Sequence, residues 1–495
     1  MLVLVTGGTG VIGQSAVTEL VQRGHTVRLL SRNADSDAEQ WAERVEPHPG
    51  DVANMADVTG VATDCDAILH IAGIVSESPP DVTFESVNIG GTRNIVAEAQ
   101  RAKVKRLVCV SSLGAERGES EYHKSKLKAE QIVRGFTGEW IICRPGNVYG
   151  PGDEVISLIL KVVRTSPVIP VIDQGDQPLQ PVWYEDVGRA LAMAVERDDL
   201  ASQVLELAGA DRTSMNDLLR RFGKITGKET HQVHIPGFLA SLGVKAASVF
   251  GLSLPIDESQ LKMLSEGNII REAGGNALDT VFDIVPTPLD VGLRKLADAL
   301  PEQMLSDGVG DLRRKRFWAD ISGCDLTPEA LFERVRQNFD DLMPVETGSE
   351  PGTKDRVPDL GETLTMALPM RGTIQVRVQE LSERLMTLST LEGHPIAGAV
   401  RFLAEERGAQ IRFEIQIFER AANVVDLITM RTIGDIMQNA TWEKLITRIV
   451  AESRGTMPDG VKSETTSLGK EQAKKIEEWL DDLVKARKRE EHAVS

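Results

Sequence analysis

Residues 1–13 read MLVLVTGGTGVIG, an apolar strand that runs into a glycine-rich turn and then into a helix. Glycine permits the positive φ of a tight turn, and without a Cβ it lets a pyrophosphate approach the N–H groups at the start of the helix. The order of strand, glycine turn and helix predicts a nucleotide site. The residues expected to form it are Gly7, Thr9, Gly10, Val11, Ile12 and Gly13.

Short apolar runs alternate with helical stretches after this loop. The runs cover residues 26–30, 67–71, 106–110 and 140–143. Such alternation predicts an α/β fold, a Rossmann doubly wound parallel sheet that binds its ligand at the carboxyl ends of the strands.

Several motifs fall at these strand ends. They read TGGTGVIG (6–13), HIAG (70–73), VNIGGTRN (87–94), VSS (110–112), YHKSK (122–126) and RPGNVYGP (144–151). Their type and order resemble the extended and atypical short-chain dehydrogenase/reductases, which are NAD(P)-dependent and epimerase/dehydratase-like. The resemblance covers about residues 1–300 and implies a dinucleotide-binding domain with substrate-cleft segments at about 180–300.

Tyr122 and Lys126 are four residues apart and would share one helix face. A free tyrosine has a pKa of about 10, and a nearby ammonium favours the phenolate, so we expect Tyr122 to be an acid/base with a lowered pKa. The resemblance implies that Lys126 also holds the nicotinamide ribose and that Ser112 orients the substrate oxygen, with Ser111 as the alternative. It implies a proton path through Asn88, for which a packing role is the alternative.

The end of the second predicted strand bears on the choice of cofactor. A carboxylate there binds the adenosine ribose in NAD-preferring sites, but this chain has Ser31 followed by Arg32. Arg32 could clamp a 2′-phosphate, so we expect NADP(H), with NAD(H) as the alternative. The resemblance adds Asp51 and Val52 at the adenine, and the further contacts Ala72, Gly73 and Pro145.

The segment after residue 180 contains three features that bear on function. Asp186 is expected to cap a helix over 187–194. The stretch 235–256 is apolar but broken by proline and glycine, which favours helices over a substrate cleft, with a membrane-surface contact as the alternative. His231 and His234 lie in a stretch, 230–236, that is predicted to be a strand and has no nearby third ligand, so no metal is expected.

The second half changes character. A strand is predicted over 314–321, a helix over 327–342 and a loop over 343–359, and alternating apolar residues predict strands over 373–378, 385–391, 399–402 and 410–418. The last strand places Ile411, Phe413, Ile415 and Ile417 on one face. A closing helix carries an apolar stripe of Trp442, Leu445, Ile446 and Ile449, and the two stripes are expected to face one cavity. The order resembles the START-like (SRPBCC) helix-grip fold, an α+β domain over 306–460. The resemblance implies an apolar cavity, into which Ala399 could face. His394 is expected to be a turn residue.

Composition limits the remaining possibilities. The chain has 495 residues, enough for two domains, and a charged helical tail is predicted over 461–495. A net charge of −18 opposes binding to nucleic acid. Four cysteines without paired spacing and the absence of a visible targeting segment indicate a cytoplasmic protein. No oligomeric state is indicated.

Two functions are compatible with these features. The first is an oxidoreductase or epimerase-like enzyme that acts on a carbonyl or secondary alcohol of a small, lipophilic molecule. The second is a nonenzymatic dinucleotide-binding module similar to the Rossmann accessory subunit of respiratory complex I. The resemblance to that group rests on VSSLGA at 110–115 and on PTPL followed by GLR at 286–294. The intact Y-x-x-x-K motif favours the enzyme.

Overall fold

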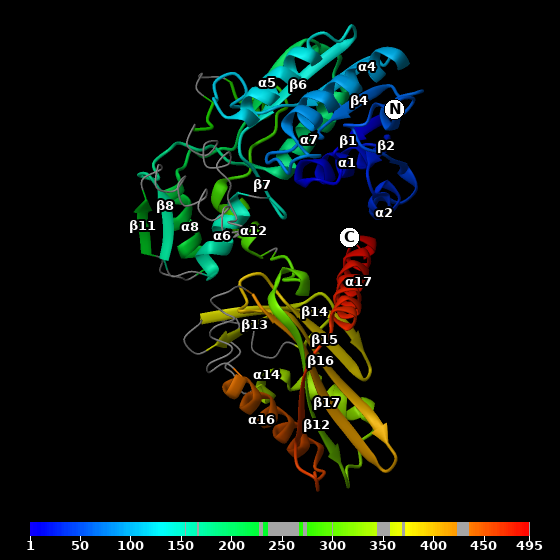
Figure 1. The fold of residues 1–495 in the computed structure, drawn as a ribbon, viewed down its shortest axis with the longest axis vertical. Coiled ribbons are helices and arrows are strands. Elements are labelled where there is room, and N and C mark those ends of the chain that lie inside the picture. Colours follow the sequence, from blue (N-terminus) through cyan, green and yellow to red (C-terminus); the bar gives the residue numbers. More distant parts are fainter. Residues whose placement is uncertain are drawn as a thin grey trace. The chain divides into compact units, whose positions relative to one another are not determined.

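The computed structural model describes residues 1–153, 155–165, 168–226, 231–235, 267–270, 275–298, 300–343, 357–368, 372–422 and 435–494. The chain divides into two compact units, residues 1–299 and 300–495 (Figure 1). Each unit has its own sheet and its own buried core. The two are described separately below.

The first unit contains a seven-stranded sheet in the order β10-β6-β5-β4-β1-β2-β3, with every pairing parallel. The strands are β1 (Leu2–Thr6), β2 (Thr26–Ser31), β3 (Val45–Pro49), β4 (Ala67–His70), β5 (Arg106–Val110), β6 (Glu139–Pro145) and β10 (Gln203–Leu207). The predicted doubly wound sheet is therefore confirmed.

Helices cover both faces of this sheet. Val3 and Val5 of β1 pack with α1 (Val11–Gln22) and α7 (Tyr184–Glu196), and with the short α11 (Ala277–Thr280). Leu4 packs into the opposite core, with α3 (Met55–Val58), α4 (Thr92–Ala102) and α5 (Glu121–Val133). Burial on both faces explains why the strands are continuously apolar.

A smaller lobe follows the sheet. Its strands are β7 (Val148–Tyr149), β8 (Val168–Ile172), β9 (Val182–Trp183) and β11 (His231–Ile235), and its helices are α6 (Ile156–Thr165), α8 (Met215–Thr226) and α12 (Leu289–Asp298). Their apolar side chains form a separate core. The parallel pairing of β8 with β11 confirms the strand predicted around His231. Residues 236–256, the predicted cleft or membrane segment, lie outside the described residues.

Asp186 does not cap a helix as the sequence predicted. Helix α7 begins at Tyr184, so Asp186 lies inside its first turn. Its carboxylate accepts a hydrogen bond from the Thr287 backbone N–H at 2.7 Å. The residue therefore ties α7 to the segment that leads into α12.

The second unit contains an antiparallel sheet in the order β13-β14-β15-β16-β17-β12-β18. Its strands are β12 (Val309–Ile321), β13 (Thr363–Leu368), β14 (Gly372–Ser382), β15 (Leu385–Thr390), β16 (Ile396–Arg407), β17 (Gln410–Ala421) and β18 (Lys462–Ser467). The predicted antiparallel sheet is confirmed, whereas β13 and β18 were not predicted.

One face of this sheet packs against α13 (Pro328–Gln337), α14 (Phe339–Leu342) and α16 (Asp435–Ser453). The core between them contains Ile411, Phe413, Ile415 and Ile417 of β17 and Leu445, Ile446 and Ile449 of α16, with Trp442 at its border. These are the two apolar stripes that the sequence predicted to face each other.

The opposite face packs against α17 (Lys470–Val494). The charged tail predicted over 461–495 is thus largely helical, as expected, but this helix covers the sheet and is not a separate appendage. Strand β18 pairs with β12 at one edge of the sheet, and Leu480 of α17 is fully buried. Ala399 and Phe418 lie in this second core, so Ala399 faces α17 and not the core beside α16. Because both faces of the sheet are covered, an apolar residue can lie on either side, and Ala399 does not face the predicted cavity.

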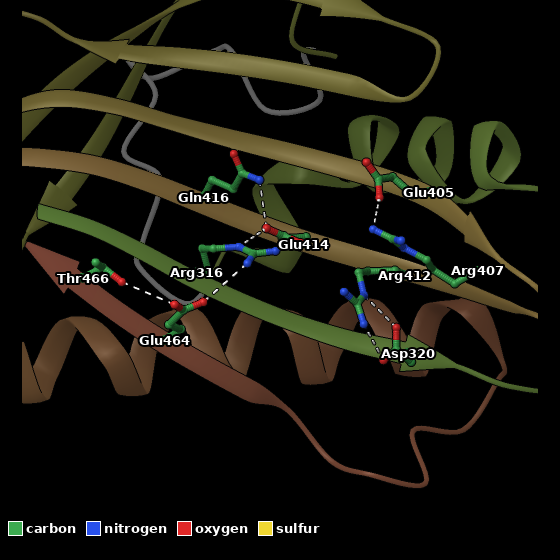
Figure 2. Close-up of polar contacts among 9 residues, drawn as sticks. All are labelled: Arg316, Asp320, Glu405, Arg407, Arg412, Glu414, Gln416, Glu464 and Thr466. Carbon is green, nitrogen blue, oxygen red and sulfur yellow. Dashed lines mark hydrogen bonds and ion pairs between the residues drawn. The ribbon is translucent and has the colours of Figure 1, made fainter. Parts of the chain in front are cut away.

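Ion pairs extend along the face that carries Phe418. Glu414 and Gln416 of β17 lie on the same side of the strand as Phe418, because the three residues are two positions apart. Arg316 of β12 contacts Glu414 at 2.6 Å (Figure 2). Farther along, Arg412 contacts Asp320 at 2.8 Å (Figure 2). The face opposite α16 is therefore apolar where Ala399 and Phe418 meet α17 and carries ion pairs at these residues.

Candidate active site

The glycine loop between β1 and α1 is shaped by close backbone contacts. Gly7 has a φ of +70°, and a Cβ there would lie 2.6 Å from the Ala72 backbone nitrogen. A Cβ on Gly13 would lie 2.0 Å from the Gly7 oxygen. Both positions thus require glycine. Helix α1 begins after Gly10 without a side-chain cap, which leaves its first turn suited to an anionic ligand.

The loop after β4 continues this cradle toward α5. A Cβ on Gly73 would lie 2.9 Å from the Lys126 Nζ and 3.1 Å from the Asn88 Oδ1. The fold therefore brings together Gly7, Ala72, Gly73, Asn88 and Lys126. Side chains at the glycines of this cradle would fill it. The space that the glycines leave open fits the dinucleotide that the sequence predicts.

Tyr122 and Ser112 lie in contact next to this cradle. Ser112 follows β5, Tyr122 is in the first turn of α5, and their side chains form a hydrogen bond. Lys126 lies one helical turn beyond Tyr122, and its Nζ donates to the Val110 carbonyl at 3.1 Å. The serine, tyrosine and lysine of the sequence prediction thus meet at the carboxyl end of β5.

Ser111 has a different role from its neighbour. Its hydroxyl donates to the Glu130 carboxylate at 2.6 Å, and Glu130 also accepts from Arg144 at 2.6 and 2.7 Å. All three side chains are buried. The geometry therefore assigns Ser112, and not Ser111, to the side of Tyr122, an assignment that the sequence left open.

The pKa of Tyr122 differs from the expectation that it would be lowered. Burial raises this pKa to about 12, and the hydrogen bond from Ser112 opposes the rise. The tyrosine ring contacts Phe84 and His123, with ring centroids 6.1 and 5.2 Å away, and the residue is buried, which disfavours the charged phenolate. Burial also lowers the pKa of Lys126, while Cys109 and Glu130 oppose that shift. For the chain without a bound cofactor, desolvation therefore has a larger effect on the pKa of Tyr122 than the Lys126 ammonium, which was expected to lower it.

Asn88 is buried in η2 (Phe84–Gly91), a π-helical segment before α4. Its side-chain amide bonds both the N–H and the carbonyl of Ile74, at 2.8 and 3.0 Å, and donates to Ser125 at 2.9 Å. These contacts hold the loop that carries Gly73. The proton path through Asn88 stays a prediction.

The residues predicted near the adenosine lie at the ends of β2 and β3. Arg32 is exposed, and Asp51 accepts a hydrogen bond from the Ala53 backbone at 2.9 Å within its own turn. Val52 is buried against Gly91, and Pro145 is buried at the end of β6. The structure adds Asp37, whose carboxylate accepts a hydrogen bond from Ser31. No sequence pattern pointed to this pair, because it depends on how the short helix α2 (Ala34–Ala38) turns back to β2.

A cavity of about 30 Å³ adjoins the residues that follow Ser112 and Tyr122. Leu113, Gly114, His123 and Asn268 contribute to its lining. A site of this volume has room for a water-sized group close to the reactive side chains.

The described ranges contain no group of three or more His, Cys, Asp or Glu residues arranged to hold a metal ion. His234 contacts the Asp173 carbonyl through Nδ1 at 3.0 Å. In the second unit, His394 lies in the turn before β16, and burial lowers its pKa to about 4. Among the helices that the structure describes, none is long and apolar enough to span a membrane.

The parallel sheet, the glycine cradle and the group of Ser112, Tyr122 and Lys126 define a dinucleotide-binding Rossmann domain. Residues 3–208 match the NAD dependent epimerase/dehydratase family, and the chain belongs to this family.

Relatives of the chain include reductases and dehydrogenases. A ceramide reductase of Caulobacter vibrioides is 30% identical over 237 residues, which cover 48% of this chain and 74% of the relative. A 3-beta-hydroxysteroid dehydrogenase of Mycolicibacterium neoaurum is 32% identical over 188 residues, covering 31% of this chain and 49% of the relative. The chain thus spans about half the length of this second relative.

Two further comparisons bear on the alternative function and on the fold. The mitochondrial NADH-ubiquinone oxidoreductase 40 kDa subunit of Neurospora crassa is 25% identical over 242 residues, covering 47% of this chain and 62% of the subunit. An NADPH-dependent quinone oxidoreductase of Escherichia coli, solved with NADPH, matches 60% of this chain and 99% of its own, with 18% identity and a TM-score of 0.51. That structure shares the fold.

Proposed function

We propose that the first unit is an NAD(P)-dependent oxidoreductase that interconverts a carbonyl and a secondary alcohol. The observation that carries the proposal is the hydrogen bond between Ser112 and Tyr122, with Lys126 one turn away beside the glycine cradle. A nicotinamide dinucleotide, when bound, supplies or accepts the hydride. The chain itself must then hold the substrate oxygen and exchange its proton.

Ser112 and Tyr122 have these tasks in the proposed mechanism. Both hydroxyls hydrogen-bond the substrate oxygen, and Tyr122 donates its proton as negative charge develops there. Because burial raises the pKa of Tyr122 to about 12, the phenol is protonated at neutral pH. That protonation state favours reduction of a carbonyl over oxidation of an alcohol.

Lys126 and Asn88 support this step. The Lys126 ammonium stabilises the phenolate that Tyr122 becomes and binds the ribose hydroxyls of the cofactor. Asn88 holds the Gly73 loop against Lys126 and leads a replacement proton toward the site. The convergence of Lys126 and Asn88 at Gly73 supports this proposal.

We propose a lipophilic substrate. Three relatives of the chain are named for such molecules: the ceramide reductase, the 3-beta-hydroxysteroid dehydrogenase and a ketoreductase of a farnesyl dihydroquinoline oxide. We propose that the second unit is a START-like helix-grip domain, a fold whose apolar cavity would suit the same class of molecule. Its order of β12, two helices, five strands and α16 is the basis for that proposal. We further propose a cytoplasmic location.

The competing function is a dinucleotide-binding structural module. The similarity to the 40 kDa subunit favours it, whereas the contact of Ser112 with Tyr122 favours catalysis. Both candidates bind a dinucleotide, so binding alone does not separate them.

Turnover with the full chain separates the two functions. The purified protein is incubated with NADH or NADPH and a ceramide bearing a ketone, a 3-oxo steroid or a short aliphatic ketone. Cofactor oxidation is followed at 340 nm and the product by mass. Reduction of a lipophilic ketone that is lost in Tyr122→Phe supports the enzyme. Tight dinucleotide binding without any turnover would leave the structural module as the better interpretation.

A further inference from the structure

The end of β2 carries a carboxylate that the linear sequence lacks. In dinucleotide-binding sheets the residue at this position faces the adenosine ribose, and an acid there bonds the ribose 2′-hydroxyl. Here the position holds Ser31, but its hydroxyl donates a hydrogen bond to the Asp37 carboxylate. Asp37 of helix α2 thus places a carboxylate beside the end of β2, where the strand itself has no acidic residue.

The Asp37 carboxylate has a second oxygen available for a ligand. One oxygen accepts from Ser31, and the other makes no hydrogen bond or ion pair with any residue that the structure describes. The side chain is partly exposed, as is Ser31. It is therefore oriented by one contact and still able to accept a hydrogen bond from another group.

Arg32, next to Ser31, supplies the opposite charge. Its side chain is exposed and forms no hydrogen bond or ion pair within the described ranges. A 2′-phosphate carries about two negative charges and would be attracted by Arg32 and repelled by Asp37. A 2′-hydroxyl would instead donate to the carboxylate. The two side chains therefore act in opposite directions on the choice between NADP(H) and NAD(H).

We propose that Asp37, held in place by Ser31, is the specificity residue that selects against the 2′-phosphate and allows the site to bind NAD(H). The inference rests on the proposed dinucleotide binding. It changes the expectation drawn from Ser31 and Arg32 alone, in which the lack of an acid at the strand end favoured NADP(H).

The test measures the affinities of NADH and NADPH for the full chain by calorimetric titration, which needs no substrate. Asp37→Asn keeps an oxygen that can accept from Ser31 but removes the charge. We expect it to strengthen NADPH by about tenfold, the scale of one charge-assisted contact, without strengthening NADH. Ser31→Ala should act in the same direction to a smaller extent, because Asp37 loses its orientation.

Two further variants complete the test. Asp35→Asn neutralises an exposed acid on the same helix and should change neither affinity. Arg32→Ala should weaken NADPH and leave NADH unchanged. An Asp37→Asn variant whose two affinities are unchanged, or change by the same factor, overturns the proposal, provided that its melting temperature shows a folded protein. A wild-type chain that binds neither dinucleotide overturns the proposed function itself.

Discussion

Arg487 and Glu302 form a buried ion pair across 185 residues of sequence, with 2.7 Å between the Arg487 Nη2 and the Glu302 Oε1. Each side chain is only 2% exposed. Arg377 and Gln379 of β14 donate to the same carboxylate oxygen. Burial raises the pKa of Glu302, but Lys488, Arg377 and Arg487 together lower it to about 2. The last helix of the chain is thus tied to the first residues of the second unit.

The boundaries of the second unit lead to the first prediction. A fragment of residues 300–495 should fold alone and unfold cooperatively, because it retains both covered faces of the sheet. A fragment of residues 306–460, the domain expected from the sequence, lacks Glu302, β18 and α17. It should aggregate or melt at a clearly lower temperature, since Ala399 and Phe418 become exposed. Circular dichroism melts of both fragments are the measurement, and equal stability would contradict the structure.

The second prediction concerns Glu302→Gln. Removing one partner of a buried charge cluster should destabilise the 300–495 fragment by about 3–5 kcal/mol at pH 7. The folded pKa of Glu302 lies below its usual value, so its contribution is present above about pH 4.5 and is lost as the pH falls toward 2. The difference from wild type in urea unfolding should therefore shrink over that range.

Glu471→Gln provides the matched control for this experiment. Glu471 is at the start of α17, is 89% exposed and, within the described part of the chain, pairs with Lys475 in the following turn. It should leave the free energy of unfolding unchanged. A Glu302→Gln effect that is equally large at pH 2.5 and pH 7 would show that packing, and not charge, is responsible.

The third prediction tests Tyr122 as the proton donor. Tyr122→Phe should lower kcat at least a hundredfold and leave dinucleotide affinity within about threefold, because the phenol exchanges a proton and does not bury the cofactor. Tyr184→Phe is the control, since the Tyr184 hydroxyl contacts Glu185 at the start of α7. Steady-state kinetics and titration of the cofactor measure both effects. Full activity in the Tyr122 variant would remove this residue from the mechanism.

The fourth prediction separates two adjacent serines. Ser112→Ala should reduce kcat with little change in stability, because its hydroxyl bonds Tyr122. Ser111→Ala should instead reduce stability by about 1–3 kcal/mol, because Glu130 loses a donor in a buried network. Thermal melts and kinetics corrected for folded protein distinguish the two outcomes. Equal loss of kcat in both variants would contradict the assignment.

The sequence by itself determined the features that depend on local spacing. Apolar runs predicted the parallel sheet, and Gly7 and Gly13 marked the cradle because only a residue without a Cβ fits those contacts. Tyr122 and Lys126 were placed on one face of α5 by helical periodicity alone. Alternation along β17 likewise predicted which of its residues enter the core.

Only the tertiary structure decided what depends on partners distant in sequence or on the turn between neighbouring elements. In the structure Ser111 hydrogen-bonds Glu130, whereas Ser112 hydrogen-bonds Tyr122. Burial raises the pKa of Tyr122, and the degree of burial cannot be read from the local motif. The tertiary structure placed Asp37 beside the end of β2. It also placed Ala399 beside α17, because alternation distinguishes the two faces of a strand but cannot say which helix covers either one.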